Sequence, residues 1–307
     1  MKNENRFQIT SSQLRVGITT KGGQVFSVKN CAGHEFLWQP NPAIWDESAP
    51  FLFPYVGKSL GDQVYFHNRA FSMPVHGFSG GLPWECADIS ENRAVFRLCD
   101  NESTRTYYPF SFKLQTTYHA VENTLIICRE ICNSGTEQMP FTMGEHIGLR
   151  TNLRPDARFD QHCIRFEKAE ASARICTTQE LFLKEKVKME WEEKGKLALR
   201  KSFFAQVPVL ILEAPRSSWV ELDAGETSGR VRVNFGKIPY LLFWSPPGEG
   251  DFVCVEPCWG TSSWAEETMD GYRRRGVILL APGETYRYVV QMTFIGADAD
   301  TSRHQGE

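Results

Sequence analysis

The sequence predicts an all-β fold, a large antiparallel β-sandwich, on three observations. Short runs rich in β-branched and aromatic residues recur from residue 93 to 133, separated by turn signals roughly every ten residues. Polar and apolar residues alternate through 7–38, which is the period of a strand with one buried face. Similar runs continue from 203 to 294, without the strand–helix alternation of a parallel sheet.

The composition indicates one globular unit. The chain has 307 residues, of which 41% are hydrophobic and 23% charged, so it can bury a sizeable core. It contains no linker, no repeat of fixed period and no low-complexity tract. We therefore expect a single domain over 1–307, in which 295–307 form a polar tail.

Charge and hydropathy exclude several classes of partner. A net charge of −3 provides no electrostatic footprint for nucleic acid or an anionic membrane. No run approaches the ~18 apolar residues of a membrane span, and the polar N-terminus has no apolar signal core. We expect a cytoplasmic protein that binds neither nucleic acid nor membrane.

The nine cysteines are an odd number without a compact framework, which predicts reduced thiols. Cys128 and Cys132 could share a strand face, as could Cys254 and Cys258. Neither pair has a histidine at zinc-ligand spacing, so we expect no metal site there and interpret these cysteines as small buried hydrophobic residues.

Near the N-terminus, Leu14, Val16 and Ile18 form a period-two run that predicts a strand in a β-meander. The apolar stretch 49–60 contains two prolines, which argue against a central ladder strand. We interpret it as a buried, irregular segment that brings Lys58 to the edge of a cavity. A lysine that snorkels to the surface is the alternative.

Two histidines occur in contexts that favour a ligand site. His76 lies in a glycine-containing loop, where backbone can approach a ligand closely. Strand alternation places His146 on the same face as Thr142 and Gly144, which leaves room beside the imidazole. For each, a histidine held only by structural hydrogen bonds is the alternative.

Glu256 follows a short apolar run that begins at Phe252 and reads as a buried strand, which we expect to stop at Pro257. Alternation places this carboxylate on the same side as Phe252 and Cys254. A carboxylate on an apolar face is costly unless it has partners or a pocket. A side chain that turns out into solvent is the alternative.

Two charged stretches are assigned to the surface. Residues 181–201 are rich in Lys and Glu and alternate in part, which predicts an exposed hairpin, or else a short amphipathic helix. The isolated run Arg273–Arg275 predicts a solvated loop and not a phosphate site.

Five segments, in this order, resemble the galactose mutarotase-like family, the aldose 1-epimerases, and within it the LacX-type branch. The segments are Phe53–Lys58, Met73–Phe78, Tyr108–Phe110, Pro140–His146 and Val255–Pro257. The likeness spans about residues 10–295. It implies a large antiparallel sandwich with a sugar site on a concave sheet face, in which a Glu and a His do the chemistry without metal or cofactor.

The resemblance also implies a role for each matching residue. Glu256 matches the family's base and His146 its acid. His76 matches a second active-site histidine that helps hold the sugar. Lys58 stands where many members have an arginine that hydrogen-bonds substrate hydroxyls.

Other positions that could recognise the sugar follow the family's pattern less closely. We expect Trp244 or Trp259 to offer a stacking surface for the flat face of a pyranose. The family's sugar-binding Asp after residue 200 is absent, and Gln206 is the nearest polar group. Glu145 stands where related sequences usually have a Gly. These differences concern recognition of the sugar more than proton transfer.

The function that follows is interconversion of the α and β anomers of a hexose or hexose derivative by acid–base ring opening. The partner is a small-molecule sugar. A non-catalytic carbohydrate-binding or sensing protein on the same fold is the alternative, because fold does not fix function. A hydrolase would usually need two acidic residues flanking the bond, and Glu256 lacks a clear acidic partner in the sequence.

Overall fold

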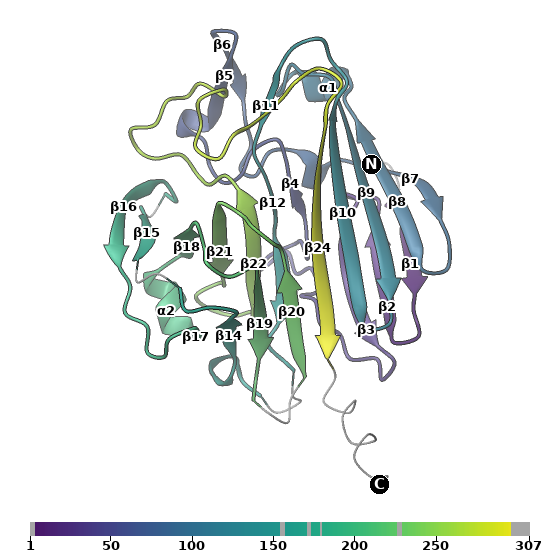
Figure 1. Cartoon of the computed structure of the whole chain (residues 1–307), viewed down its shortest axis with the longest axis vertical. Helices are drawn as coiled ribbons and strands as arrows, with labels where there is room; N and C mark the ends of the chain where they lie inside the picture. The colour runs from purple at the N-terminus through teal and green to yellow at the C-terminus, as the bar shows by residue number, and fades with distance from the viewer. Residues whose placement is uncertain (1–3, 154–156, 171–172, 179, 226–228, 296–307) are drawn as a thin grey trace.

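The computed structural model describes residues 4–153, 157–170, 173–178, 180–225 and 229–295 (Figure 1). Antiparallel sheets dominate it, which confirms the all-β prediction. The tail expected over 295–307 lies outside these ranges, apart from Ile295, which ends the last strand. Within them, no helix is long and apolar enough to cross a membrane.

The larger sheet has nine strands. In spatial order they are β17 (Lys196–Ala198), β14 (Cys163–Phe166), β19 (Trp219–Asp223), β20 (Arg230–Asn234), β24 (Thr285–Ile295), β10 (Thr124–Asn133), β9 (Phe112–Val121), β8 (Arg93–Cys99) and β7 (Glu85–Ile89). Buried and less buried residues alternate along β9 and β10, because one face packs inward and the other meets solvent.

The second sheet has eight strands. They are β16 (Leu183–Lys188), β15 (Ala173–Thr177), β18 (Val209–Glu213), β21 (Tyr240–Trp244), β22 (Phe252–Trp259), β12 (Met143–Glu145) and β4 (Phe51–Leu52), with β13 (Ile147–Arg150) also paired to β22. Unlike β9, β22 is buried over nearly its whole length, so both of its faces are covered.

Smaller elements complete the molecule. They are a three-stranded sheet of β1 (Arg6–Thr10), β2 (Leu14–Thr19) and β3 (Val25–Asn30), the pairs β5 (Gln63–Phe66)–β6 (Arg69–Ser72) and β11 (Met139–Phe141)–β23 (Ile278–Leu280), the helices α1 (Glu102–Arg105) and α2 (Lys201–Gln206), and the 3-10 turns η1 (Leu60–Asp62), η2 (Ser79–Gly81) and η3 (Phe159–Gln161). The predicted N-terminal meander is thus present as β1–β3.

One hydrophobic core joins the two large sheets. Val253 and Val255 of β22 belong to the same buried cluster as Val231 and Val233 of β20. The intervening residues of β22 point to the opposite face, where Cys258 joins a second, smaller cluster. The face of β22 that carries Glu256 is therefore turned away from the sandwich core.

Three local predictions are wrong. Residues 181–201 form no hairpin, because β16 pairs with β15 in one sheet and β17 with β14 in the other. β22 does not stop at Pro257 but continues to Trp259, since β21 still pairs alongside it. The solvated loop expected at Arg273–Arg275 is correct for Arg273 and Arg275, which are exposed, but wrong for Arg274. Arg274 is buried, with its guanidinium 3.4 Å from the ring centre of Tyr55.

Candidate active site

Glu256 lies near the middle of the eight-stranded sheet. It is 2% exposed and pairs in register with Leu242 of β21. Its Oε1 atom is buried without a hydrogen-bond partner. A buried, unsatisfied carboxyl oxygen is uncommon in folded proteins, and a ligand is one way to satisfy it.

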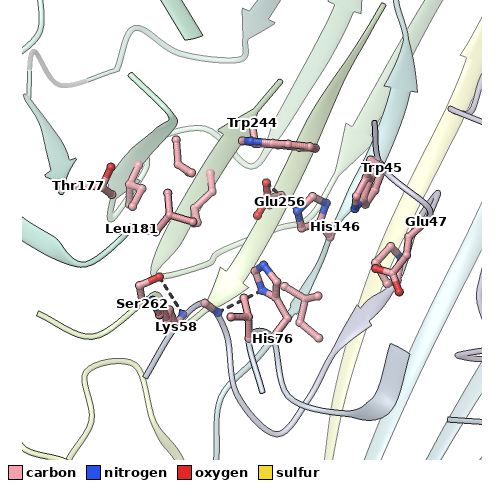
Figure 2. Close-up of a pocket in the computed structure, with 17 residues that line it drawn as sticks. Trp45, Glu47, Lys58, His76, His146, Thr177, Leu181, Trp244, Glu256 and Ser262 are labelled. Carbon is pink, nitrogen blue, oxygen red and sulfur yellow. Dashed lines mark hydrogen bonds and ion pairs between the residues drawn. The ribbon is translucent and has the colours of Figure 1, made fainter. Parts of the chain in front are cut away.

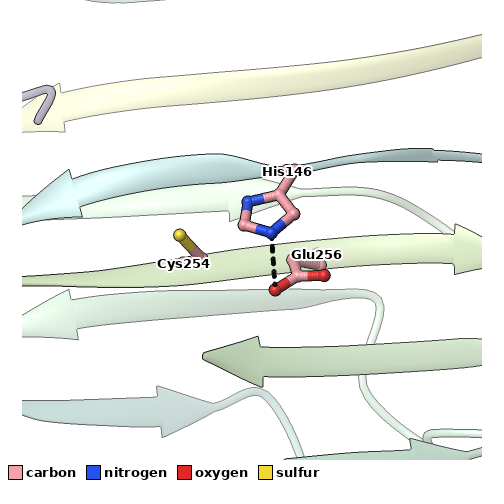
Figure 3. A group of neighbouring side chains, drawn as sticks. All are labelled: His146, Cys254 and Glu256. Atoms are coloured by element: carbon pink, nitrogen blue, oxygen red, sulfur yellow. Dashed lines mark ion pairs between the residues drawn. The ribbon is translucent and has the colours of Figure 1, made fainter. Parts of the chain in front are cut away.

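His146 lies opposite Glu256 on the neighbouring strand. The pairs Gly144–Cys258 and Ile147–Val255 keep one continuous register, which sets His146 against Glu256. Pro257, which has no N–H to donate, interrupts the ladder at this point, and the His146 N–H donates instead to the Pro50 carbonyl at 3.1 Å. The imidazole Nε2 is 3.4 Å from Glu256 Oε1. Figure 3 shows the two side chains facing each other.

His76 approaches the pair from a loop. The chain takes positive φ at His76 (64°) and Gly77 (73°), and a side chain at Gly77 would meet the Phe53 carbonyl oxygen at 2.3 Å. The Gly57 N–H donates to His76 Nδ1 at 3.1 Å. In the neutral ring the proton is therefore on Nε2. The ring centres of His76 and His146 are 5.5 Å apart, so His76 lies beside the pair of His146 and Glu256. Its Nε2–H can therefore donate to a ligand bound there.

Lys58 stands at the rim of the same cavity, as the sequence predicted. Its backbone N–H donates to Ser262 Oγ at 3.0 Å, which ties the irregular segment to the loop after β22. The ammonium lies 5.1 Å above the ring of Phe182. The stem of the lysine is thus held beside the opening while its charge remains available to a polar ligand.

Two tryptophans flank the pair. Figure 2 shows Glu256 and His146 at the centre, with Trp244 on one side and Trp45 on the other. The Trp45 ring centre is 4.9 Å from His146, and that of Trp244 is 5.9 Å away. Trp259 belongs elsewhere, since it packs on Tyr288 in the core, 4.3 Å between ring centres.

These groups line a cavity of about 240 Å³. Drug-sized ligands usually occupy roughly 300–1,000 Å³, so this one suits a single small ring. Of the residues predicted for the site, Glu256, His146, His76, Lys58 and Trp244 line the cavity.

Gln206 is not brought to this cavity. It is exposed at the end of α2, so we do not include it in the proposed site. Trp45 also lines the cavity, and its sequence context does not predict this. It follows a tight turn in which its N–H donates to the Asn41 carbonyl, and such a turn leaves no periodic pattern to read.

Burial decides the charge state of the pair. It raises the pKa of Glu256 to about 8, and the carboxyl is uncharged at neutral pH. Burial, together with the neighbouring His76, lowers the pKa of His146 well below 6.5. Burial also lowers the pKa of His76 to about 4. At neutral pH the pair of Glu256 and His146 thus carries one proton, held on Glu256.

Glu145, which stands where related sequences usually have a Gly, has its side chain on the face of the sheet opposite the cavity. Its carboxylate accepts two hydrogen bonds from Arg129 of β10, at 2.8 and 2.7 Å, and both side chains are buried between the sheets. Arg129 also donates to Thr116 Oγ1 at 2.6 Å. Glu145 therefore contacts the core and not the cavity.

Among the residues that the structure describes, one group of side chains could ligate a metal ion. His146, Cys254 and Glu256 offer nitrogen, sulfur and oxygen atoms within 4.8 Å of one another (Figure 3). Zinc accepts such a set. Burial raises the pKa of the Cys254 thiol, as it does that of Glu256, so a metal would have to displace both protons. It would also occupy the atoms that proton transfer needs.

Fold and cavity together define a β-sandwich protein of the galactose mutarotase-like type. The family model described as aldose 1-epimerase matches residues 5–293. The chain belongs to the aldose 1-epimerase family.

Among curated proteins, the chromosomal protein LacX of Lactococcus lactis subsp. lactis is 26% identical over 269 residues, 85% of this chain and 89% of the relative. This similarity confirms the predicted likeness to the LacX-type branch.

Solved structures are similar over nearly the whole chain. A galactose mutarotase related enzyme from Lactobacillus acidophilus has a TM-score of 0.89 at 26% identity, covering 95% of this chain and 98% of its own. A galactose mutarotase-like protein from Lactobacillus casei has a TM-score of 0.87 at 24% identity, covering 94% and 100%. At 16% identity, a putative aldose 1-epimerase from Escherichia coli K12 shares the fold, with a TM-score of 0.75 over 95% and 99% of the two chains.

Proposed function

We propose that this protein is an aldose 1-epimerase-like enzyme that interconverts the α and β anomers of a hexose or hexose derivative. The observation that carries the proposal is the approach of Glu256 Oε1 to His146 Nε2, 3.4 Å apart in a cavity of about 240 Å³. Anomer exchange requires one proton acceptor and one proton donor close together, and this pair supplies both with one shared proton.

The reaction begins when the sugar enters and its hydroxyls solvate the pair. The shared proton then passes to His146, which leaves Glu256 as carboxylate. Glu256 takes the proton from the C1 hydroxyl while His146 gives its proton to the ring oxygen. The C1–O5 bond breaks, and C1 becomes a carbonyl carbon. Net charge does not change, which suits a cavity that disfavours isolated charges.

Ring closure repeats these transfers in reverse. After rotation about the C1–C2 bond, the O5 hydroxyl attacks the other face of the carbonyl carbon. His146 takes back the O5 proton, and Glu256 returns a proton to O1. The enzyme ends as it began, without a metal, an oxidant or a reductant. Each positioned transfer typically contributes ~10²–10⁴-fold to rate.

The remaining residues orient the sugar. His76 donates from Nε2 to a sugar oxygen, and Lys58 offers its ammonium to hydroxyls at the rim. Trp244 and Trp45 face the pair from two sides and can stack on the C–H face of a pyranose. We further propose that the enzyme works in the cytoplasm, which its nine free cysteines support.

The test is proton NMR of a freshly dissolved pure anomer, for a panel of aldoses. We expect at least one aldose to equilibrate faster with enzyme than in buffer. Calorimetric sugar binding without any acceleration of exchange would instead favour a carbohydrate-binding or sensing protein.

A further inference from the structure

One wall of the cavity is aliphatic, and it begins directly beside Glu256. In strand register, Glu256 pairs with Leu242 of β21, and Leu242 pairs with Ile211 of β18. Neighbouring strands are ~4.8 Å apart, so these two side chains extend about 5 and 10 Å from the carboxyl group across the sheet. A pyranose ring held with C1 at Glu256 would reach both of them.

The rest of this wall offers little to a hydroxyl group. Val209 and Leu181 also line the cavity on this side, whereas Thr177 and Ser262 are the hydroxyl-bearing side chains among its lining residues that the structure describes. Figure 2 shows Thr177 and Leu181 on the side of Glu256 opposite Trp45 and Glu47. Leu242 is 5% exposed and Ile211 2%, so both side chains are almost completely enclosed.

A sugar hydroxyl pressed against this wall would lose its water without gaining a partner, whereas an apolar hydrogen or methyl group would lose nothing. Resting on the function proposed above, we propose that the substrate is a deoxyaldose. Specifically, it is an aldose that lacks a hydroxyl on the ring edge facing Leu242 and Ile211. His76 and Lys58, which also line the cavity, serve the hydroxyls that remain.

The test compares matched sugar pairs that differ by one hydroxyl. The pairs are 6-deoxy-D-glucose and D-glucose, D-fucose and D-galactose, L-rhamnose and L-mannose, and 2-deoxy-D-glucose and D-glucose. In at least one pair we expect the deoxy member to have the higher kcat/KM for anomer exchange, by about 10-fold, because an unpaired buried hydroxyl costs roughly this factor. Equal or faster exchange of the parent sugar in every pair would overturn the proposal.

Two variants connect the preference to the wall. Val209→Thr keeps the branched shape and adds a hydroxyl to the wall, and because Val209 is partly exposed the variant should fold. Leu242→Asn adds an amide closer to Glu256. Both should reduce the deoxy preference several-fold, whereas Glu249→Gln, an exposed change outside the cavity, should leave it unchanged. An unaltered preference in Val209→Thr would contradict the assignment to this wall.

Calorimetry with the same pairs separates this proposal from the proposed function. If no aldose exchanges faster than in buffer, the epimerase function fails, yet a deoxy sugar should still bind about 10-fold more tightly than its parent. If parent sugars bind and exchange better, the epimerase function stands and the deoxyaldose assignment is wrong.

Discussion

The buried carboxyl of Glu256 should make the stability of this protein depend on pH, and Glu256→Gln should remove that dependence. The residue is 2% exposed, and its Oε1 atom has no hydrogen-bond partner. Its pKa rises from 4.5 to about 8 on folding. A glutamine has almost the same shape but cannot ionise, so the variant isolates the cost of the charge.

The magnitude follows from proton linkage. Below pH 4.5 the folded and unfolded states both hold the proton, and the raised pKa costs nothing. Between pH 4.5 and about 8 the unfolded state releases the proton while the folded state keeps it, so the free energy of unfolding falls by ~1.4 kcal/mol per pH unit. The loss reaches about 5 kcal/mol above pH 8. Relative to wild type, Glu256→Gln should therefore gain about 5 kcal/mol across this window.

The assay is urea unfolding followed by tryptophan fluorescence at pH 4.5, 6, 7.5 and 9, for wild type and variant. Glu249→Gln, at an exposed carboxylate, is the matched control and should track wild type within ~0.5 kcal/mol at every pH. Because the shift of His146 is common to both proteins, it largely cancels in the difference. A constant stability difference between Glu256→Gln and wild type would show that the carboxyl is solvated and would refute the reasoning.

Four further outcomes are expected. Anomer exchange should fall as pH rises through about 8, because Glu256 then ionises and the pair has no acid left. It should also fall well below pH 6.5, because His146 then gains a proton and the pair has no base left. A profile of rate against pH measures both changes. Arg129→Met should lower the free energy of unfolding by ~3–5 kcal/mol by leaving the Glu145 carboxylate buried and unpaired, and adding Glu145→Leu should restore most of it, as urea unfolding would show. His76→Ala should raise KM about 2–10-fold with a smaller effect on kcat, and His76→Gln should recover part of the loss because its amide can also donate. Dialysis against a chelator should leave exchange unchanged, since the proposed proton transfers need no metal; loss of activity that zinc restores would instead assign a metal to His146, Cys254 and Glu256.

Local sequence pattern was sufficient to predict which side chains of a single strand share a face. Alternation predicted that Glu256 shares a face with Cys254, and the ligand atoms of the two do lie within 4.8 Å of each other and of His146. The meeting of Glu256 with His146 was not readable from either segment. It depends on pairing between strands more than 100 residues apart, and only the resemblance to a family suggested it.

The failures also have physical causes. Pro257 was expected to end its strand, but the neighbouring β21 pairs alongside it and a proline costs only its own hydrogen bond. Gln206 was assigned to the site because the sequence after residue 200 was compared with a strand, whereas Lys201–Gln206 form a helix. Arg274 was assigned to solvent on charge alone, and its burial against Tyr55 is a tertiary contact without a local signal.

The deciding measurement is magnetisation exchange between the anomeric protons of an aldose at equilibrium, with wild type and Glu256→Gln at equal concentration. Because both anomers are present throughout, the rate reports catalysis and not binding. A carboxyl and an imidazole that share one proton predict exchange above the buffer rate for wild type and a loss of ~10²–10⁴-fold, or to the buffer rate, for the variant. Equal exchange by the two proteins would contradict the central role given to this pair.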